Sequence, residues 1–123
     1  MKKLLFSIAW TVAVLCVQAA DVTPISNAFS AGNADLLNDY IASEVDIVTP
    51  DASKKGNDKD AIAILKSFFQ SQKPMGFTVV HHADKNDSGF LVGKMTTANK
   101  EFRVNITYTS KDGKIFITII RIE

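Results

Sequence analysis

The fold is decided by residues 101–122, which read EFRVNITYTSKDGKIFITIIRI. Apolar and polar residues alternate on both sides of Asp112-Gly113, a dipeptide typical of two-residue hairpin turns. The pattern therefore predicts two long antiparallel strands. Pairing Lys111 with Lys114 gives a register in which Tyr108 faces Ile117, Ile106 faces Ile119 and Val104 faces Arg121.

This register gives the hairpin one apolar face and one mixed face. The apolar face is expected to hold Phe102, Val104, Ile106, Tyr108, Ile115, Ile117 and Ile119. The mixed face then carries Phe116, Ile120 and Ile122 among polar residues. Large apolar side chains on a face that should be wet suggest a partner, and a homodimer is one expectation. A slip of one residue would exchange the two faces.

Three further strands are predicted upstream of the hairpin. Two of them, near 77–83 and 90–98, are separated by the polar turn 86–89. A short first strand covers 45–49, and residues 51–56 read as a polar loop. The expected sheet is antiparallel, with four long strands and this short one.

The clearest helix covers residues 57–72, where Asn57 and Asp60 form a capping-box pattern. Its apolar stripe comprises Ala61, Ile62, Leu65, Phe68 and Phe69. A first helix is expected to start with Thr23 as N-cap and Pro24, and to stop at Gly32. A second short helix would carry Leu36, Leu37, Tyr40 and Ile41.

This order of elements resembles the cone-shaped α+β fold named after nuclear transport factor 2. More narrowly, the chain resembles a bacterial family of small exported domains of unknown function in that superfamily. The resemblance is carried by 25–29 with 32–33, 45–47, 65–69, 92–93, 102–104 and 121–123. It implies helices packed on a curved antiparallel sheet. The superfamily includes dehydratases, isomerases and many non-enzymatic binding domains, so the fold leaves function open.

Residues 1–20 have the features of a secretory signal peptide. Lys2 and Lys3 precede the apolar segment 4–17, which is too short to span a membrane comfortably. Cleavage is expected after Ala19 or Ala20, giving an exported, periplasmic or secreted domain of residues 21–123 with no membrane span. The alternatives are an N-terminal membrane anchor and a lipoprotein attached through Cys16. Lipid attachment fits poorly, because Leu15 stands where a small residue is expected just before the cysteine.

The composition describes one globular domain. The 123 residues are 46% hydrophobic and 22% charged. Removing Lys2 and Lys3 leaves 12 basic against 13 acidic residues, which gives no basic field for nucleic acid. Cys16 is the single cysteine, so the cleaved chain would have neither a disulfide nor a thiol ligand.

The predicted ligand contacts line the inside of the cone. Neighbouring residues on a strand point to opposite faces, so one ring of His81-His82 faces inward. The candidates for contact with a small apolar ligand are Phe68, Phe69, Phe77, Val79, His81 and Tyr108. The alternative is that these side chains simply fill the core. The chain has no phosphate-binding glycine motif, nucleophile elbow or HExxH motif, and we expect no cofactor or metal.

A non-catalytic binding or accessory domain is therefore the prediction. The alternative is a small periplasmic hydrolase or isomerase in which the inward histidine acts with an acid. Asp46 lies between Val45 and Ile47 and is expected to face solvent instead. Arg103 and Arg121, the only arginines, fall on opposite faces in the register above; each could bind a carboxylate or phosphate, or pair structurally.

Overall fold

The computed structural model describes residues 19–123, so most of the predicted signal peptide, with Cys16, lies outside the described residues. In chain order the elements are α2 (Thr23–Ala31), η1 (Ala34–Leu37), β1 (Ile41–Val48), β2 (Ser53–Gly56), α3 (Asp58–Ser71), β3 (Gly76–Lys85), β4 (Ser88–Thr96), β5 (Glu101–Lys111) and β6 (Lys114–Ile122). None of the helices between residues 19 and 123 has the length and apolar character needed to cross a bilayer.

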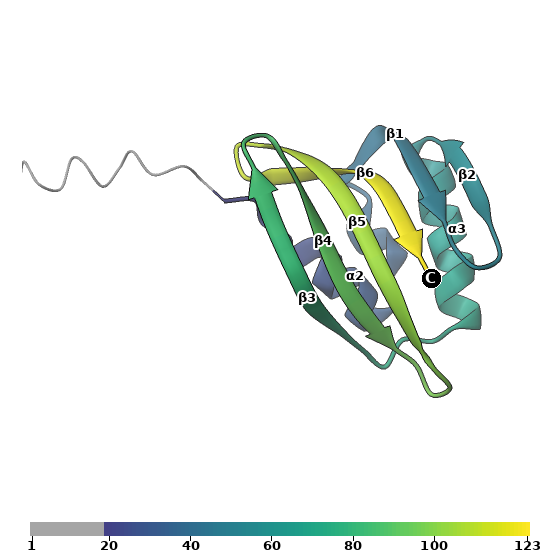
Figure 1. The fold of residues 1–123 in the computed structure, drawn as a ribbon. Coiled ribbons are helices and arrows are strands. Elements are labelled where there is room, and N and C mark those ends of the chain that lie inside the picture. The colour runs from purple at the N-terminus through teal and green to yellow at the C-terminus, as the bar shows by residue number, and fades with distance from the viewer. Residues whose placement is uncertain (1–18) are drawn as a thin grey trace, which may run out of the picture.

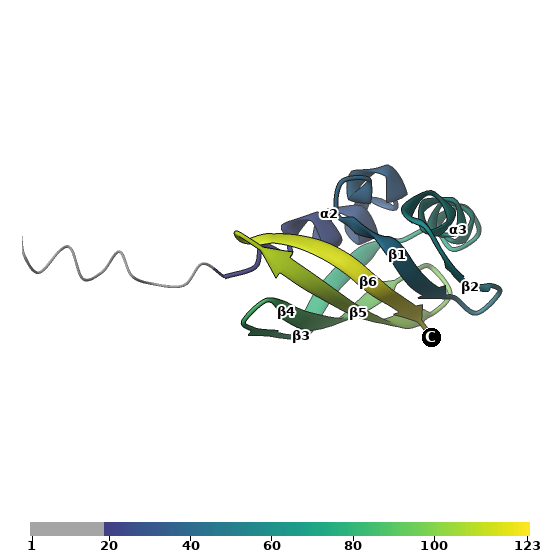
Figure 2. The same ribbon diagram turned by 90° about the horizontal axis from the view of Figure 1, so that it is seen from above.

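The strands form one curved sheet in the order β2-β1-β6-β5-β4-β3. Neighbouring strands are antiparallel except β1 and β6, which are parallel. Both α2 and α3 lie on one face of this sheet, α2 behind the half that contains β3 and α3 behind the half that contains β1 (Figures 1 and 2). We call the face turned away from these helices the outer face. The predicted α+β architecture is confirmed.

Three predictions about the first half of the chain need correction. The sheet is mixed, because β1 and β6 are parallel, and it has six strands, because Ser53–Gly56 forms β2 where the sequence predicted a loop. The predicted second helix is only the 3₁₀ turn η1, and Ile41 already belongs to β1. Thr23 is the first residue of α2 and not its cap; its backbone N–H instead donates to the Asp21 carboxylate.

Other local predictions are confirmed. Gly32 ends α2 in the left-handed conformation, with φ of 66°. The side chain of Asn57 accepts from the Asp60 N–H, and the Asp60 side chain accepts from the Asn57 N–H, which completes the capping box of α3. Asp112 and Gly113 both have positive φ, as a two-residue hairpin turn requires.

A β-bulge in β6 overturns the predicted hairpin register beyond Tyr108. Tyr108 pairs with Ile117 as predicted, but the next residue, Thr107, pairs with Ile119, so the ladder shifts at Thr118. Ile106 therefore faces Ile120, and Val104 faces Ile122.

The bulge has a clear energetic reason. It buries Ile120 and Ile122 completely and leaves Ile119 and Arg121 exposed. A regular ladder would have turned Arg121 into the core, and an unpaired buried charge costs several kcal/mol. The predicted outer position of Ile120 and Ile122 is wrong.

Candidate functional site

Four of the six predicted ligand contacts lie inside the curve of the sheet. Phe68 and Phe69 project from α3, while Phe77 and Tyr108 project from the sheet. Val79 belongs to the edge strand β3 and is 38% exposed. The structure therefore brings most, but not all, of the predicted set together.

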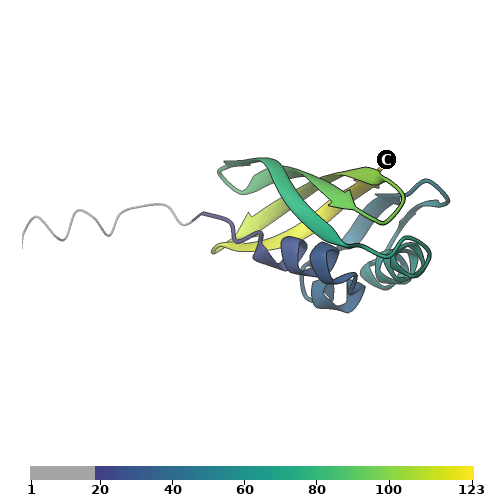
Figure 3. The same cartoon turned by 90° about the horizontal axis from the view of Figure 1, so that it is seen from below.

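The interior is filled by phenylalanine rings that pack on one another. The Phe29 ring lies 5.2 Å from that of Phe69 and 5.3 Å from that of Phe77. Phe68 continues the series at 5.9 Å from Phe69 and 5.2 Å from Phe102. These are ordinary centroid separations for packed aromatic pairs. Figure 3 shows the layer between helices and sheet that these side chains occupy.

The two histidines do separate to opposite faces, and the inward one is His82. The His81 ring packs at 5.3 Å from the Phe90 ring, away from the helices. A register shift between Val79 and His81 in β3 decides this arrangement. Because Val80 is the extra residue, alternation counted from Phe77 gives the wrong face for His81. His81 is therefore not an interior contact.

Three polar groups meet inside the sheet near the end of β3. His82 Nε2 lies 2.7 Å from the Tyr108 hydroxyl oxygen and 3.3 Å from Asp84 Oδ1. The Tyr108 hydroxyl donates a hydrogen bond to the same Asp84 oxygen. We call these residues the Tyr–His–Asp cluster.

Gly89 on β4 makes the cluster possible. It pairs with Asp84 on one side and with Tyr108 on the other, so the three residues form one row across the sheet. A Cβ atom on Gly89 would lie 2.6 Å from the Tyr108 hydroxyl and 2.8 Å from the Asp84 carboxylate. The tyrosine side chain therefore reaches Asp84 only because β4 has no side chain at this position.

In this cluster the Tyr108 hydroxyl keeps its proton and is a poor proton donor for chemistry. The hydroxyl has a single proton, and it donates this proton in the hydrogen bond to Asp84. In the bond with His82 the hydroxyl oxygen must therefore be the acceptor, which requires a proton on Nε2 of the imidazole. Burial, and then the hydrogen bond and charge of Asp84, raise the pKa of the Tyr108 hydroxyl above its ordinary value of 10.0. The three groups satisfy one another, and their arrangement suits a structural polar network.

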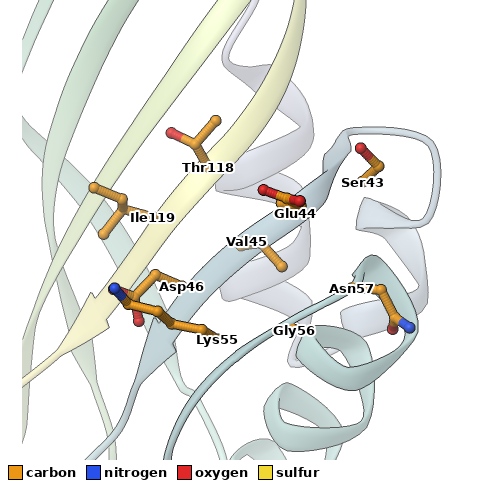
Figure 4. A pocket seen from close by; sticks show the side chains of 9 residues that line it. All are labelled: Ser43, Glu44, Val45, Asp46, Lys55, Gly56, Asn57, Thr118 and Ile119. Carbon is orange, nitrogen blue, oxygen red and sulfur yellow. The ribbon is translucent and has the colours of Figure 1, made fainter.

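One hollow opens on the outer face, and we call it hollow 1 (Figure 4). It has a volume of about 590 Å³. Its lining residues are Ser43, Glu44, Val45, Asp46, Lys55, Gly56, Asn57, Thr118 and Ile119.

Two irregularities in neighbouring strands create hollow 1. Ile41 pairs with Ile117 and Asp46 pairs with Ile119, so four residues of β1 lie opposite one residue of β6. The extra residues of β1 bow away from β6 exactly where β6 carries its own bulge, at Thr118.

The chemistry of hollow 1 is mixed. Glu44 and Asp46 supply carboxylates, and Lys55 lies opposite Asp46 in the β1–β2 register. Ile119, which is 37% exposed, adds apolar surface. As predicted, Asp46 faces away from the core, between buried Val45 and Ile47.

A second hollow, hollow 2, lies on the outer face over β3, β4 and β5. It has a volume of about 400 Å³ and is lined by Val80, Val92, Gly93, Lys94, Glu101, Phe102, Arg103 and Glu123. Lys94 and Arg103 are directly opposite each other in the β4–β5 register. Because the β6 bulge turns Arg121 outward, both arginines share this face, and the prediction that they lie on opposite faces is wrong.

Two smaller hollows flank α3 and the β5–β6 turn, with volumes of about 340 and 370 Å³. None of these four hollows is lined by Phe69, Phe77 or Tyr108. Within residues 19–123, no three His, Cys, Asp or Glu side chains come together in a way that would hold a metal ion.

Both hollows were missed by the sequence reasoning. One signal was available in the sequence: the alternating isoleucines of residues 115–122 change phase at Ile119-Ile120, and a change of phase indicates a bulge. The bowing of β1 left no comparable signal, because it depends on pairing with a strand about 70 residues further along the chain.

Comparison with known proteins agrees with this architecture. A DUF4783 family protein from Bacteroides uniformis is 33% identical, with a TM-score of 0.76, covering 82% of this chain and 94% of that one. Another, from Bacteroides fragilis, is 35% identical, with a TM-score of 0.73 and coverages of 80% and 93%. A designed nuclear-transport-factor-2-like protein shares the fold alone, at 16% identity and a TM-score of 0.69, with coverages of 83% and 92%.

No curated protein matches the chain. The family described as "Domain of unknown function (DUF4783)" matches residues 22–123. This chain therefore belongs to the DUF4783 family, and its fold is nuclear-transport-factor-2-like.

Proposed function

We propose that this protein is an exported, non-catalytic domain that binds a small ligand on the outer face of its sheet. One observation carries the proposal: hollows 1 and 2 open on the outer face, whereas none of the four hollows is lined by Phe69, Phe77 or Tyr108 of the interior. Ligand sites in proteins are typically concave regions of about 300–1,000 Å³ with an apolar lining and a few polar groups. Both hollows have that size.

The interior offers much less to a ligand. A ligand inside the cone would have to displace Phe29, Phe69 or Phe77, which pack on one another at 5.2–5.3 Å. Opening such a core costs several kcal/mol, because each buried aromatic side chain contributes about 3–5 kcal/mol. Binding outside the sheet needs no such rearrangement.

Exposed apolar side chains on the outer face support the same proposal. Val80 is 61% exposed and Phe90 is 41% exposed. Val80 lines hollow 2, and Ile119 lines hollow 1. Apolar surface that remains in water is typical of sites that are covered by a ligand or partner.

Export is supported by the pattern of residues 1–20, and the described contacts next to the expected cleavage site are compatible with it. Ala20 and Val22 pack against the core, and the Asp21 N–H donates to the Gly113 carbonyl at 2.9 Å. Cleavage after Ala19 would leave all of these contacts in place.

The test is native mass spectrometry of the protein recovered after export by the cells that produce it. A bound ligand appears as extra mass that is lost on denaturation. Ile119→Asp and Val80→Asp place a charge in hollows 1 and 2, and at least one of them should abolish the extra mass. Met75→Asp is the matched control, since Met75 is 72% exposed but lines neither hollow.

The same spectra test a homodimer formed through the outer face, with Phe90 and Ile119 in the interface. A dimer that Ile119→Asp dissociates and Met75→Asp leaves intact would replace the small ligand with a second copy of the chain. Bare monomers in all samples would contradict both versions of the proposal.

A small hydrolase or isomerase is the second candidate, and the Tyr–His–Asp cluster favours it. His82 lies beside both a carboxylate and a hydroxyl, the groups that general acid–base catalysis uses. Against it, Tyr108 is completely buried and its hydroxyl already donates a hydrogen bond to Asp84. An activity that His82→Gln removes and His81→Gln retains would establish the enzyme.

A further inference from the structure

Hollow 2 combines apolar side chains with a pair of cations on facing strands, and this combination points to a class of ligand. Glu101 and Glu123 also line the hollow, and Glu101 forms only a long, exposed ion pair with Lys94. We propose that hollow 2 binds a small organic carboxylate with an apolar tail, the carboxylate lying between Lys94 and Arg103 and the tail on Val80 and Val92. The proposal rests on the proposed function for its choice of the outer face. It adds the site and the chemistry of the ligand.

The cation pair is the first argument. Lys94 and Arg103 are direct partners in the β4–β5 ladder. Side chains in such a position have Cβ atoms about 4.5–5.5 Å apart, and like charges placed there are destabilising. An anion bound between the two would convert this repulsion into two attractions.

The second argument is that Arg103 is free to bind. Lys94 has a weak ion pair with Glu101 at 3.8 Å, and both side chains are more than half exposed. Among residues 19–123, no carboxylate lies at ion-pair distance from the guanidinium of Arg103. A guanidinium can bind a carboxylate through two parallel hydrogen bonds, which gives both strength and orientation.

The backbone of Arg103 is held by neighbouring strands on both sides. Its N–H donates to the Glu123 carbonyl and its carbonyl accepts from the Glu123 N–H, both at 2.9 Å. Arg103 also pairs with Lys94 on its other side, so it lies inside the sheet and not at its edge. The point at which the Arg103 side chain leaves the sheet is therefore fixed beside Lys94, while the exposed side chain itself still loses rotamer freedom on binding.

The apolar floor is the third argument. Val80 is the extra residue of the β3 bulge, and it stands 61% exposed beside Val92. Inorganic anions would gain nothing from these side chains. An acyl tail would bury them, and each methylene removed from water favours binding by about 0.8 kcal/mol.

The experiment titrates the folded domain (residues 20–123, labelled with ¹⁵N) with sodium decanoate and follows amide shifts. We expect shifts at Val80, Val92, Lys94 and Arg103. Arg103→Gln should weaken binding about tenfold, since a hydrogen bond to a charged group is worth roughly that factor. Inorganic phosphate, which has the charge but no tail, should bind at least about tenfold more weakly.

Arg121→Gln is the matched control. It removes the same charge from the same face, but Arg121 does not line hollow 2. Decanoate affinity should change less than about twofold in this variant, whereas a loss equal to that of Arg103→Gln would mean unspecific attraction and overturn the proposal. Equal binding of phosphate and decanoate, or the absence of shifts around hollow 2, would also overturn it.

Failure here can be separated from failure of the proposed function. Suppose decanoate does not bind while the exported protein carries a mass that Ile119→Asp removes. The outer-face function then stands, with hollow 1 as its site, and the carboxylate assignment is wrong. If native mass spectrometry of the exported protein also shows no bound ligand, both the small-ligand function and the carboxylate site are contradicted.

Discussion

The Tyr108 hydroxyl lies 2.7 Å from Nε2 of His82, although the two residues belong to strands that are not neighbours in the sheet. The tyrosine side chain crosses β4 to reach the histidine, and it crosses at Gly89. One residue without a side chain thus connects three strands through a polar network. Several properties of the domain depend on this contact.

Gly89→Ala should destabilise the domain by about 1–3 kcal/mol, since the new methyl group has no room to form without moving its neighbours. Its Cβ would lie 2.6 Å from both the Ala83 carbonyl oxygen and the Tyr108 hydroxyl. Urea unfolding measures the effect. Gly76→Ala is the control, because its nearest neighbour is the Thr96 hydroxyl at 3.2 Å, and it should cost clearly less. Equal costs would mean that Tyr108 does not cross β4 at this point.

Tyr108→Phe should change how stability depends on pH above about 10, the ordinary pKa of tyrosine. The pKa of Tyr108 is raised in the folded domain, so the unfolded chain releases this proton at a lower pH than the folded one. The stability that the retained proton provides is complete below pH 10 and is lost as the pH rises further. Between pH 9 and 11, the free energy of unfolding should fall more in the wild type than in Tyr108→Phe.

The same variant should cost about 1–3 kcal/mol at neutral pH, because it removes the donor to the Asp84 carboxylate and leaves a polar group without its partner. Urea unfolding at pH 7 measures this cost. Parallel losses in the two proteins between pH 9 and 11 would show that Tyr108 ionises as freely in the folded domain as in the unfolded chain.

The imidazole of His82 should carry a proton on Nε2, since Nε2 donates to the Tyr108 oxygen. Long-range ¹H–¹⁵N spectra of the imidazole rings distinguish the two tautomers directly. His81, on the other face, provides the internal comparison. A proton only on Nδ1 of His82 would mean that the hydroxyl donates to the histidine, and the proton order given for the cluster would be reversed.

Ile120→Ala and Ile119→Ala test the bulge in β6 as a matched pair. Ile120 is fully buried and its truncation should cost about 2–5 kcal/mol. Ile119 is 37% exposed, so the same change there should cost less than about 1 kcal/mol. A regular ladder reverses the two values, which makes the order of the two free energies of unfolding decisive.

Local patterns in the sequence predicted most of the fold. The capping box at Asn57 and the hairpin turn at Asp112-Gly113 depend on a few neighbouring residues, so the sequence determines them directly. The parallel pairing of β1 with β6 was not predicted, because it joins segments separated by most of the domain. The strand β2 was missed because its residues Ser53–Gly56 are polar and exposed, as in a loop.

The candidate site was much harder to predict than the fold. Simple alternation fails after one extra residue, and such residues occur at Val80 in β3 and at Thr118 in β6. These two bulges decide which histidine faces inward and which side Arg121 occupies. A third irregularity lies in β1 and helps to form hollow 1. That hollow therefore depends on β1, β6 and the segment around Gly56, which are far apart in the sequence. Counting alternation from one residue of a strand therefore does not predict these three irregularities.

The most direct test of the proposed binding on the outer face is to locate any ligand that co-purifies with the exported protein, by intermolecular NOEs to the methyl-labelled domain. Binding on the outer face predicts NOEs to the methyl groups of Val80, Val92 or Ile119, which are at least partly exposed there. It predicts none to Ile106 and Ile117, which are completely buried on the inner side. NOEs confined to Ile106 and Ile117 would place the ligand inside the cone and contradict the account.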